Sequence, residues 1–161
     1  MAESKINVGE KAPSFALKNQ DDQTVKLSDP ALKGHWVVLY FYPKDDTPGC
    51  TIEACDFTSG LKDFEKLDAV VLGCSPDSPE MHRKFIAKHK LKIELLSDPS
   101  HEMLERYGAW GEKNMYGKIS MGVIRSTVII DPAGKVAHHY RKVSAKGHAD
   151  AVRAKLKELQ A

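Results

Sequence analysis

Apolar and polar residues fall into blocks along this chain of 161 residues, and the blocks predict its elements. Segments 15–18 and 24–27 flank a polar turn, which predicts an N-terminal β-hairpin. The run 36–42 is continuously apolar and rich in β-branched and aromatic residues, and a second, largely apolar run covers 69–74. Runs of this kind are typical of strands that are buried on both faces of a sheet.

Helical patterns follow each of the two buried runs. A helix is expected after the loop that ends at Cys50, with an interruption at Gly60. Ser78 followed by Pro79 is a favourable start for a second helix, because serine caps the first turn and proline suits the first helical position. This helix is expected to fade near residue 90. Its apolar residues are Met81, Phe85 and Ile86.

The C-terminal third contains one further short helix, two strands and a longer helix. Residues 101–107 predict the short helix, and residues 109–122, which show no clear period, are expected to form a loop. The segments 126–131 and 135–140 predict two strands that are joined by a tight turn. The final helix presents one apolar stripe, formed by Ala149, Val152, Leu156 and Leu159.

The order of these elements predicts the fold. The length suits a single domain over residues 1–161. Buried strands that alternate with amphipathic helices predict an α/β protein with helices on both faces of a sheet. An order of β-α-β followed by β-β-α is that of a thioredoxin-like fold. We therefore expect a central mixed sheet flanked by helices, with the N-terminal hairpin added. Fold alone does not determine function.

Charge and composition narrow the class of protein. The net charge is only +2 and the lysines are interleaved with acidic residues, so nucleic-acid binding is not expected. Residues 1–8 lack the apolar core of a signal peptide, and no run has the length of a membrane span. The expected location is the cytoplasm. In that compartment an odd number of cysteines, here three, favours reactive or inert thiols over structural disulfides.

Cys50 stands where a loop turns into a helix. The first N–H groups of a helix lack partners and its dipole is positive there, and both effects stabilise a thiolate over a thiol. Gly49 permits close approach, Pro48 stiffens the turn, and the hydroxyl of Thr47 can bond to a thiolate or a peroxide. A buried, inert cysteine is the alternative, but this neighbourhood favours a nucleophile.

Cys55 follows Cys50 by five residues. On one regular helix this spacing separates the two Cα atoms by roughly 8–9 Å, whereas a disulfide needs them within about 7 Å. A bond between these cysteines therefore requires the first turns of the helix to unwind. Cys74 falls within the apolar run 69–74 and is expected to pack as a small, inert hydrophobic residue.

Three segments carry a resemblance to a known family. The sequence Phe41-Tyr-Pro-Lys-Asp-Asp-Thr-Pro-Gly-Cys50-Thr-Ile-Glu-Ala-Cys55 resembles the peroxiredoxin signature as it occurs in the bacterioferritin comigratory protein, or Q-type, subfamily. Segments 107–117 and 125–131 are also similar to that subfamily, and the resemblance extends from about residue 8 to the last helix. It implies a thiol-dependent peroxidase for hydrogen peroxide and organic hydroperoxides, on a thioredoxin-like fold and without a cofactor or metal.

The resemblance also implies roles for individual residues. Cys50 matches the peroxidatic cysteine, which becomes a sulfenic acid, and Cys55 matches the resolving cysteine, which then forms a disulfide with it. Thr47 matches the residue that orients the peroxide, and Pro43 the one that shields the pocket from water. Arg125 matches the arginine that stabilises the thiolate and the polarised O–O bond. The implied reductant is thioredoxin or a glutaredoxin-like protein, and the subfamily favours monomers.

Two other functions compete with this interpretation. A general thiol-disulfide oxidoreductase on the same fold would carry Cys-x-x-Cys at the helix start, whereas this chain has a longer spacing together with Thr47 and Arg125. A zinc-binding or interaction module would use two close ligand pairs, and only the pair of Cys50 and Cys55 is present. A peroxidase is therefore the favoured prediction.

Overall fold

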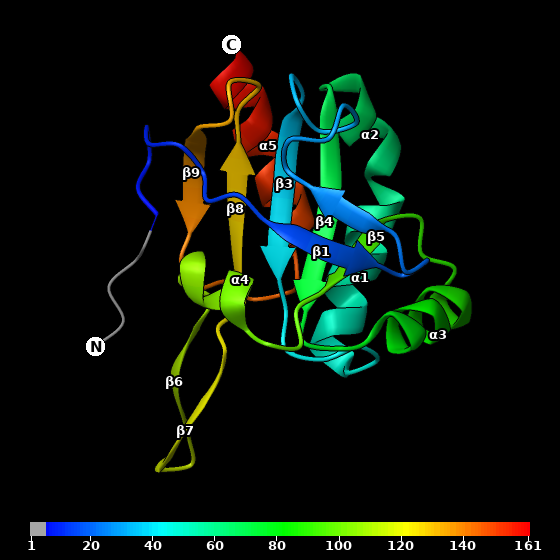
Figure 1. Cartoon of the computed structure of the whole chain (residues 1–161), viewed down its shortest axis with the longest axis vertical. Coiled ribbons are helices and arrows are strands. Elements are labelled where there is room, and N and C mark those ends of the chain that lie inside the picture. The colour runs from blue at the N-terminus through cyan, green and yellow to red at the C-terminus, as the bar shows by residue number, and fades with distance from the viewer. Residues whose placement is uncertain (1–5) are drawn as a thin grey trace.

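The computed structural model describes residues 6–161 (Figure 1). The prediction that residues 1–8 carry no secretory signal falls mostly outside this range. Within it, seven strands form one mixed sheet in the order β2-β1-β5-β4-β3-β8-β9. The strands of this sheet are β1 Ala16–Asn19, β2 Thr24–Lys26, β3 Trp36–Phe41, β4 Ala69–Ser75, β5 Glu94–Ser97, β8 Ser126–Ile130 and β9 Val136–Tyr140.

The two apolar runs of the sequence form the centre of this sheet. β3 and β4 pair in parallel, with Val38 opposite Val71 and Phe41 opposite Cys74. On its other side β3 pairs antiparallel with β8, and β9 continues the sheet antiparallel to β8. All four strands that the sequence predicts in these regions are confirmed, with small shifts at their ends, and so is the N-terminal hairpin of β1 and β2.

β5 is a strand that the sequence analysis did not predict. It pairs in parallel with β4 and antiparallel with β1, so it connects the N-terminal hairpin to the rest of the sheet. Its only apolar residues are Leu95 and Leu96, and so short a stretch carries no periodicity. Both leucines are completely buried. Their burial is a consequence of the neighbouring strands rather than of a local pattern.

Alternate residues of β3 face opposite sides of the sheet, and each side has its own core. Val38 and Tyr40 face a core that α1, α2, α3 and α5 cover, whereas Leu39 and Phe41 face a core that α4 and the segment 6–15 cover (Figure 1). The helices are α1 Pro48–Ser59, α2 Leu61–Lys66, α3 Pro79–His89, α4 Glu102–Arg106 and α5 His148–Gln160. None of these helices has both the length and the apolar character needed to cross a membrane. The predicted mixed sheet with helices on both faces is confirmed.

Helix boundaries follow the signals in the sequence. Gly60 separates α1 from α2, as predicted. The Ser78 side chain accepts a hydrogen bond from the N–H of Met81 at 3.2 Å, and α3 is followed by the C-cap residue Lys90, which adopts a left-handed conformation (φ 54°). Of the residues of α3, Phe85 and His82 are buried, whereas Met81 is exposed. Buried polar partners, described below, satisfy the imidazole.

The prediction that residues 109–122 form a loop was wrong. They belong to a separate antiparallel hairpin of β6 Trp110–Met115 and β7 Lys118–Val123, which projects from the body of the molecule (Figure 1). Tyr116 and Gly117 at its tip adopt left-handed conformations (φ 56° and 80°), as a tight two-residue turn requires. Beyond its root the hairpin buries little of either face, so its sequence lacks the alternation that marks a half-buried strand.

Gly73 on β4 provides a test of the packing between the sheet and α1. A Cβ atom at Gly73 would lie 2.8 Å from Leu95 Cδ2 and 2.9 Å from the Tyr40 hydroxyl, and both side chains are completely buried. Gly73→Ala should therefore lower the free energy of unfolding by about 1–3 kcal/mol. Gly60→Ala is the matched control, because its Cβ would meet nothing closer than 3.6 Å. Urea unfolding measures both effects, and equal stability of the two variants would contradict the prediction.

Candidate active site

Cys50 is the third residue of α1, where the loop after β3 ends. Thr47 is the N-cap residue, with an extended backbone (φ −98°, ψ 156°), and Pro48 occupies the first helical position. The N–H of Thr51 donates to the carbonyl of Thr47 at 2.8 Å. The N–H groups of Gly49 and Cys50 precede this bond, so they point out of the helix start beside the thiol. The structure thus places Cys50 at a helix N-terminus, as the sequence predicts.

Arg125 lies in the short connection between β7 and β8 and reaches the thiol of Cys50. Its Nη2 lies 3.2 Å from Sγ, and its Nη1 donates to Oε1 of Glu53 at 2.5 Å. Cys50 is 1% exposed and the Arg125 side chain is 17% exposed, so water and salt screen this contact poorly. A guanidinium that donates to sulfur in such a setting stabilises the thiolate form.

Gly49 allows the guanidinium to come this close. A Cβ atom at Gly49 would lie 3.1 Å from Nη2 of Arg125, which is tighter than ordinary van der Waals contact. The sequence predicts close approach at Gly49 without indicating which group approaches. In the structure the Arg125 side chain approaches there, so the absence of a side chain at residue 49 serves the contact between Arg125 and Cys50.

Glu53 is a site residue that the sequence analysis missed. Its side chain is completely buried, and its Oε2 has no hydrogen-bond partner among the described residues. Burial raises the pKa of this carboxyl to about 7, although Arg125 opposes the shift. Helical spacing could have revealed Glu53, because residues three and four apart share a helix face. It lies three residues after Cys50 and four before Phe57, both of which are buried.

Thr47 and Pro43 lie in the loop that leads from β3 to α1. The Thr47 hydroxyl donates to the carbonyl of Lys44 at 2.8 Å, and its oxygen keeps the capacity to accept a hydrogen bond from a peroxide. Pro43 is half-buried at the start of the same loop. The structure therefore brings Thr47, Cys50 and Arg125 to one end of α1.

The other two cysteines lie in contrasting places. Cys55 is half-buried on α1, which is unbroken over residues 48–59, so the separation of roughly 8–9 Å expected between its Cα and that of Cys50 applies. All three cysteines are free thiols. Cys74 is completely buried on β4, in the core on the opposite face of the sheet. Burial raises the pKa of its thiol, and the nearby Asp98 adds to the shift.

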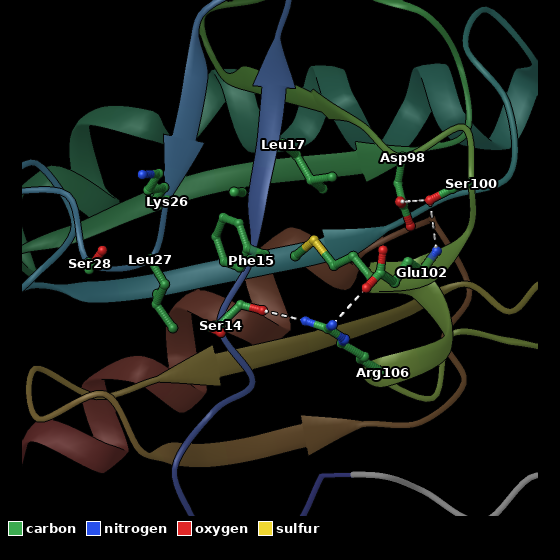
Figure 2. A pocket seen from close by; sticks show the side chains of 12 residues that line it. Ser14, Phe15, Leu17, Lys26, Leu27, Ser28, Asp98, Ser100, Glu102 and Arg106 are labelled. Carbon is green, nitrogen blue, oxygen red and sulfur yellow. Dashed lines mark hydrogen bonds and ion pairs between the residues drawn. The ribbon is translucent and has the colours of Figure 1, made fainter.

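A cavity of about 430 Å³ lies between the N-terminal segment, the end of β2 and α4 (Figure 2). Phe15, Met103 and Arg106 are among its lining residues, and Arg106 donates to the carbonyl of Ser14 at 3.3 Å. Phe15 and Met103 belong to one core of the protein, whereas Cys50 belongs to the core on the other face of the sheet. The cavity is therefore separate from the thiol site.

The raised pKa of Glu53 gives stability a pH dependence that can be measured. The folded state binds the Glu53 proton more tightly than the unfolded state does. The contribution of Glu53 to the free energy of unfolding therefore falls as pH rises from about 4.5 to about 7. Relative to wild type, Glu53→Gln should therefore gain on the order of 1–3 kcal/mol in unfolding free energy between about pH 5 and about pH 8. Urea unfolding at both pH values measures this gain. The exposed Glu65→Gln serves as control, and an equal gain in that variant would refute the assignment.

The chain matches known proteins over almost its whole length. The AhpC/TSA family matches residues 8–139. Peroxiredoxin Bcp of Bacillus subtilis (strain 168) is 48% identical over 154 residues, which cover 96% of this chain and 97% of that protein. A putative peroxiredoxin bcp of Helicobacter pylori (strain J99) is 47% identical over 148 residues, which cover 92% of this chain and 96% of that protein.

Solved structures agree with these matches. Peroxiredoxin Q of Xanthomonas campestris superposes with a TM-score of 0.86 at 41% identity, over 94% of this chain and 97% of that chain. A mutant of Xylella fastidiosa PrxQ superposes with a TM-score of 0.91 at 36% identity, over 99% and 100% of the two chains. The mixed sheet flanked by helices is therefore the thioredoxin-like fold of peroxiredoxins, as predicted. The chain belongs to the AhpC/TSA family and, within it, to the Bcp or Q-type peroxiredoxins, which are thiol-dependent peroxidases.

Proposed function

We propose that the Cys50 thiolate attacks the terminal oxygen of hydrogen peroxide or of an organic hydroperoxide. The S–O bond forms as the O–O bond breaks, and the sulfur is oxidised to a sulfenic acid. The departing oxygen takes up a proton and leaves as water or as an alcohol. The observation behind this proposal is the 3.2 Å contact between Arg125 Nη2 and Cys50 Sγ, which puts a permanent cation beside the nucleophile.

Arg125 and Thr47 act on the transition state in this mechanism. Negative charge grows on the departing oxygen as the O–O bond breaks, and a fixed donor beside it lowers the barrier. Glu53 holds the guanidinium of Arg125, so the donor is in place before the reaction begins. Thr47 accepts a hydrogen bond from the peroxide O–H, and Pro43 limits the access of water to this end of α1.

Cys55 is the resolving cysteine in this mechanism. Its thiol attacks the sulfur of the sulfenic acid, the S–S bond forms, and the oxygen leaves as water. Because α1 is continuous over residues 48–59, its first turns must unwind before the two sulfurs can meet. Helix ends open at a low free-energy cost, and Ile52 in this region is already 45% exposed. Cys74 takes no part, since it lies in the other core.

Another dithiol protein then reduces the disulfide, and we assign this step to thioredoxin or a glutaredoxin-like protein. Because Cys50 and Cys55 lie on one helix, their disulfide forms within a single chain, and we assign the protein as a monomer of the cytoplasm. A related protein supports organic hydroperoxides as substrates. Alkyl peroxide reduction is the activity attributed to the bacterioferritin comigratory protein of Xanthomonas campestris, whose trapped intermediate and ligand complexes have been solved.

Cysteine variants test the chemistry. Cys50→Ser should abolish peroxide consumption, because a neutral hydroxyl lacks the nucleophilicity of a thiolate near neutral pH. Cys55→Ser should still reduce peroxide stoichiometrically but should stop thioredoxin-dependent turnover. Cys74→Ala is the control and should turn over normally. Peroxide loss is followed with thioredoxin, its reductase and NADPH. Peroxidase activity in Cys50→Ser would refute the proposal, and a collapse of turnover in Cys74→Ala alone would make Cys74 the resolving residue.

Oxidation should unfold the start of α1. When the disulfide between Cys50 and Cys55 forms, amides over residues 51–57 should lose protection against hydrogen exchange, because the intact helix holds the two Cα atoms too far apart. β3 and β8 are the internal controls and should keep their protection. Exchange is measured on reduced protein and on protein shown by mass to hold the bond. Equal protection of residues 51–57 in both states would mean that the disulfide forms without unwinding.

A further inference from the structure

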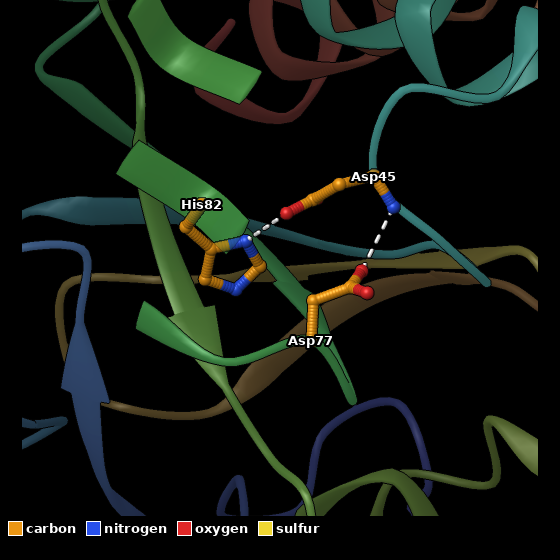
Figure 3. A group of neighbouring side chains, drawn as sticks. All are labelled: Asp45, Asp77 and His82. Carbon is orange, nitrogen blue, oxygen red and sulfur yellow. Dashed lines mark hydrogen bonds and ion pairs between the residues drawn. The ribbon is translucent and has the colours of Figure 1, made fainter. Parts of the chain in front are cut away.

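A buried cluster of polar side chains connects the loop before Cys50 to α3 and β5. Asp45 of that loop and His82 of α3 are 3% and 0% exposed, and Asp45 Oδ2 lies 2.6 Å from His82 Nδ1 (Figure 3). The Tyr42 hydroxyl donates to Asp45 Oδ1, also at 2.6 Å. The backbone N–H of Asp45 donates to Oδ2 of Asp77 at 2.8 Å (Figure 3). Both the side chain and the backbone of Asp45 are therefore held.

Both ring nitrogens of His82 have hydrogen-bond partners. Its Nδ1 faces the carboxylate of Asp45, and its Nε2 lies 2.9 Å from the carbonyl oxygen of Leu96 on β5. The imidazole is therefore held from two sides, by the loop before α1 and by β5. Removing either Asp45 or His82 would leave a buried polar group without its partner, which is costly.

The same cluster has the spacing of a small cation site, but its bonds do not suit one. Ligand atoms of Asp45, Asp77 and His82 lie within 4.8 Å of one another. Both ring nitrogens of His82 are already bonded, and Oδ2 of Asp77 accepts from the Asp45 N–H and from the Ser75 hydroxyl. A metal would have to displace protons and break these bonds. The contacts therefore indicate that the cluster holds the loop against α3 rather than binding a metal.

The position of Asp45 in the sequence connects this buried cluster to the thiol site. Asp45 precedes Thr47, the N-cap residue of α1, by two residues. Between them, Asp46 adopts a left-handed backbone (φ 60°), and its side chain, 40% exposed, contacts Lys88 at 2.7 Å and His89 at 2.8 Å. Exposed pairs of this kind add little stability. The path of the chain into α1 is therefore set chiefly at Asp45.

We propose that the buried pair of Asp45 and His82 positions the start of α1 for the reaction with peroxide and is the fixed point from which that start unwinds during resolution. This inference rests on the proposed roles of Cys50 and Cys55. A buried pair with several hydrogen bonds resists separation, whereas a helix end opens readily, so the opening of α1 does not extend back to residue 45. Asp45 and His82 are positioning residues, since their described bonds do not reach the thiol.

A double-mutant cycle tests the positioning role. Asp45→Ala and His82→Leu each leave a buried polar partner unpaired. Each should lower the rate constant for the reaction of the Cys50 thiol with hydrogen peroxide by about 10- to 100-fold, as expected when a reacting group is displaced. The double variant should lose no more than the slower single variant, whereas independent residues would multiply their losses. The rate of disulfide formation should not fall in any of the three variants. Stopped-flow tryptophan fluorescence follows both steps.

Two controls separate positioning from general destabilisation. Asp46→Asn removes the neighbouring exposed charge, and asparagine tolerates the left-handed backbone at that residue. Val136→Ala weakens the core on the opposite face of the sheet. Both controls should keep the peroxide rate constant within about twofold of wild type. A loss in Val136→Ala as large as that in Asp45→Ala would overturn the proposal, because overall stability would then set the rate.

Hydrogen exchange on the wild-type protein tests the fixed point without relying on any variant. The amide of Asp45, which donates to Asp77, should keep its protection on oxidation while the amides of residues 51–57 lose theirs. Parallel loss at Asp45 would overturn the fixed point, and wild-type peroxide rate constants in Asp45→Ala and His82→Leu would overturn the positioning role. A Cys50→Ser protein that remains active would instead overturn the proposed function.

Discussion

The contact between the Arg125 guanidinium and the Cys50 sulfur constrains the rest of the site. It joins two residues that are far apart in sequence, and the pairing of β3 with β8 brings them together. Phe41 at the end of β3 lies opposite Ser126 at the start of β8. Because α1 begins soon after β3 and Arg125 directly precedes β8, the register of this one strand pair puts the arginine beside the helix start. Gly49 removes the atom that would crowd the guanidinium.

The guanidinium beside the thiol is held by a second buried group, the carboxyl of Glu53. Sulfur, guanidinium and carboxyl therefore lie together where little water reaches. Burial raises the pKa of Glu53 to about 7, although the guanidinium of Arg125 opposes this shift.

α1 must satisfy two opposed demands. Its intact first turn supplies the N–H groups and the dipole that favour a thiolate, yet a bond to Cys55 requires the same turn to open. Placing Cys50 at the start of the helix reconciles these demands, because α1 can open from its free end through the turns that separate Cys50 from Cys55. Phe57 marks the far limit of this segment, and its ring stacks on Tyr40 with ring centroids 4.7 Å apart. The chemistry thus uses the end of the helix from which opening costs least.

Local patterns predicted the elements that depend on local sequence. The apolar runs became β3 and β4, and Ser78 caps α3. The failures occur where distant residues decide the outcome. The two leucines of β5 are buried only because β4 and β1 flank them, and His82 is buried because Asp45, from another element, meets its ring.

At the thiol site, the motif predicted which residues to consider, and the structure brings Cys50 and Arg125 into contact. It also adds Glu53, whose spacing from Cys50 was visible in the sequence but had no meaning until the buried face of α1 was known. The hairpin of β6 and β7 had no such signal, because a strand that buries neither face has no pattern to display.

The hairpin of β6 and β7 leads directly to Arg125, and its root is firmly closed. The N–H of Ile124 donates to the carbonyl of Ala109 at 2.7 Å, and His101 stacks on Trp110 with ring centroids 3.9 Å apart. These contacts fix the root of the hairpin between its outer arm and the arginine. The tip of the hairpin can therefore be lengthened, shortened or replaced, by evolution or by design, which would change the surface available to other molecules. The chemistry at the start of α1 would stay the same.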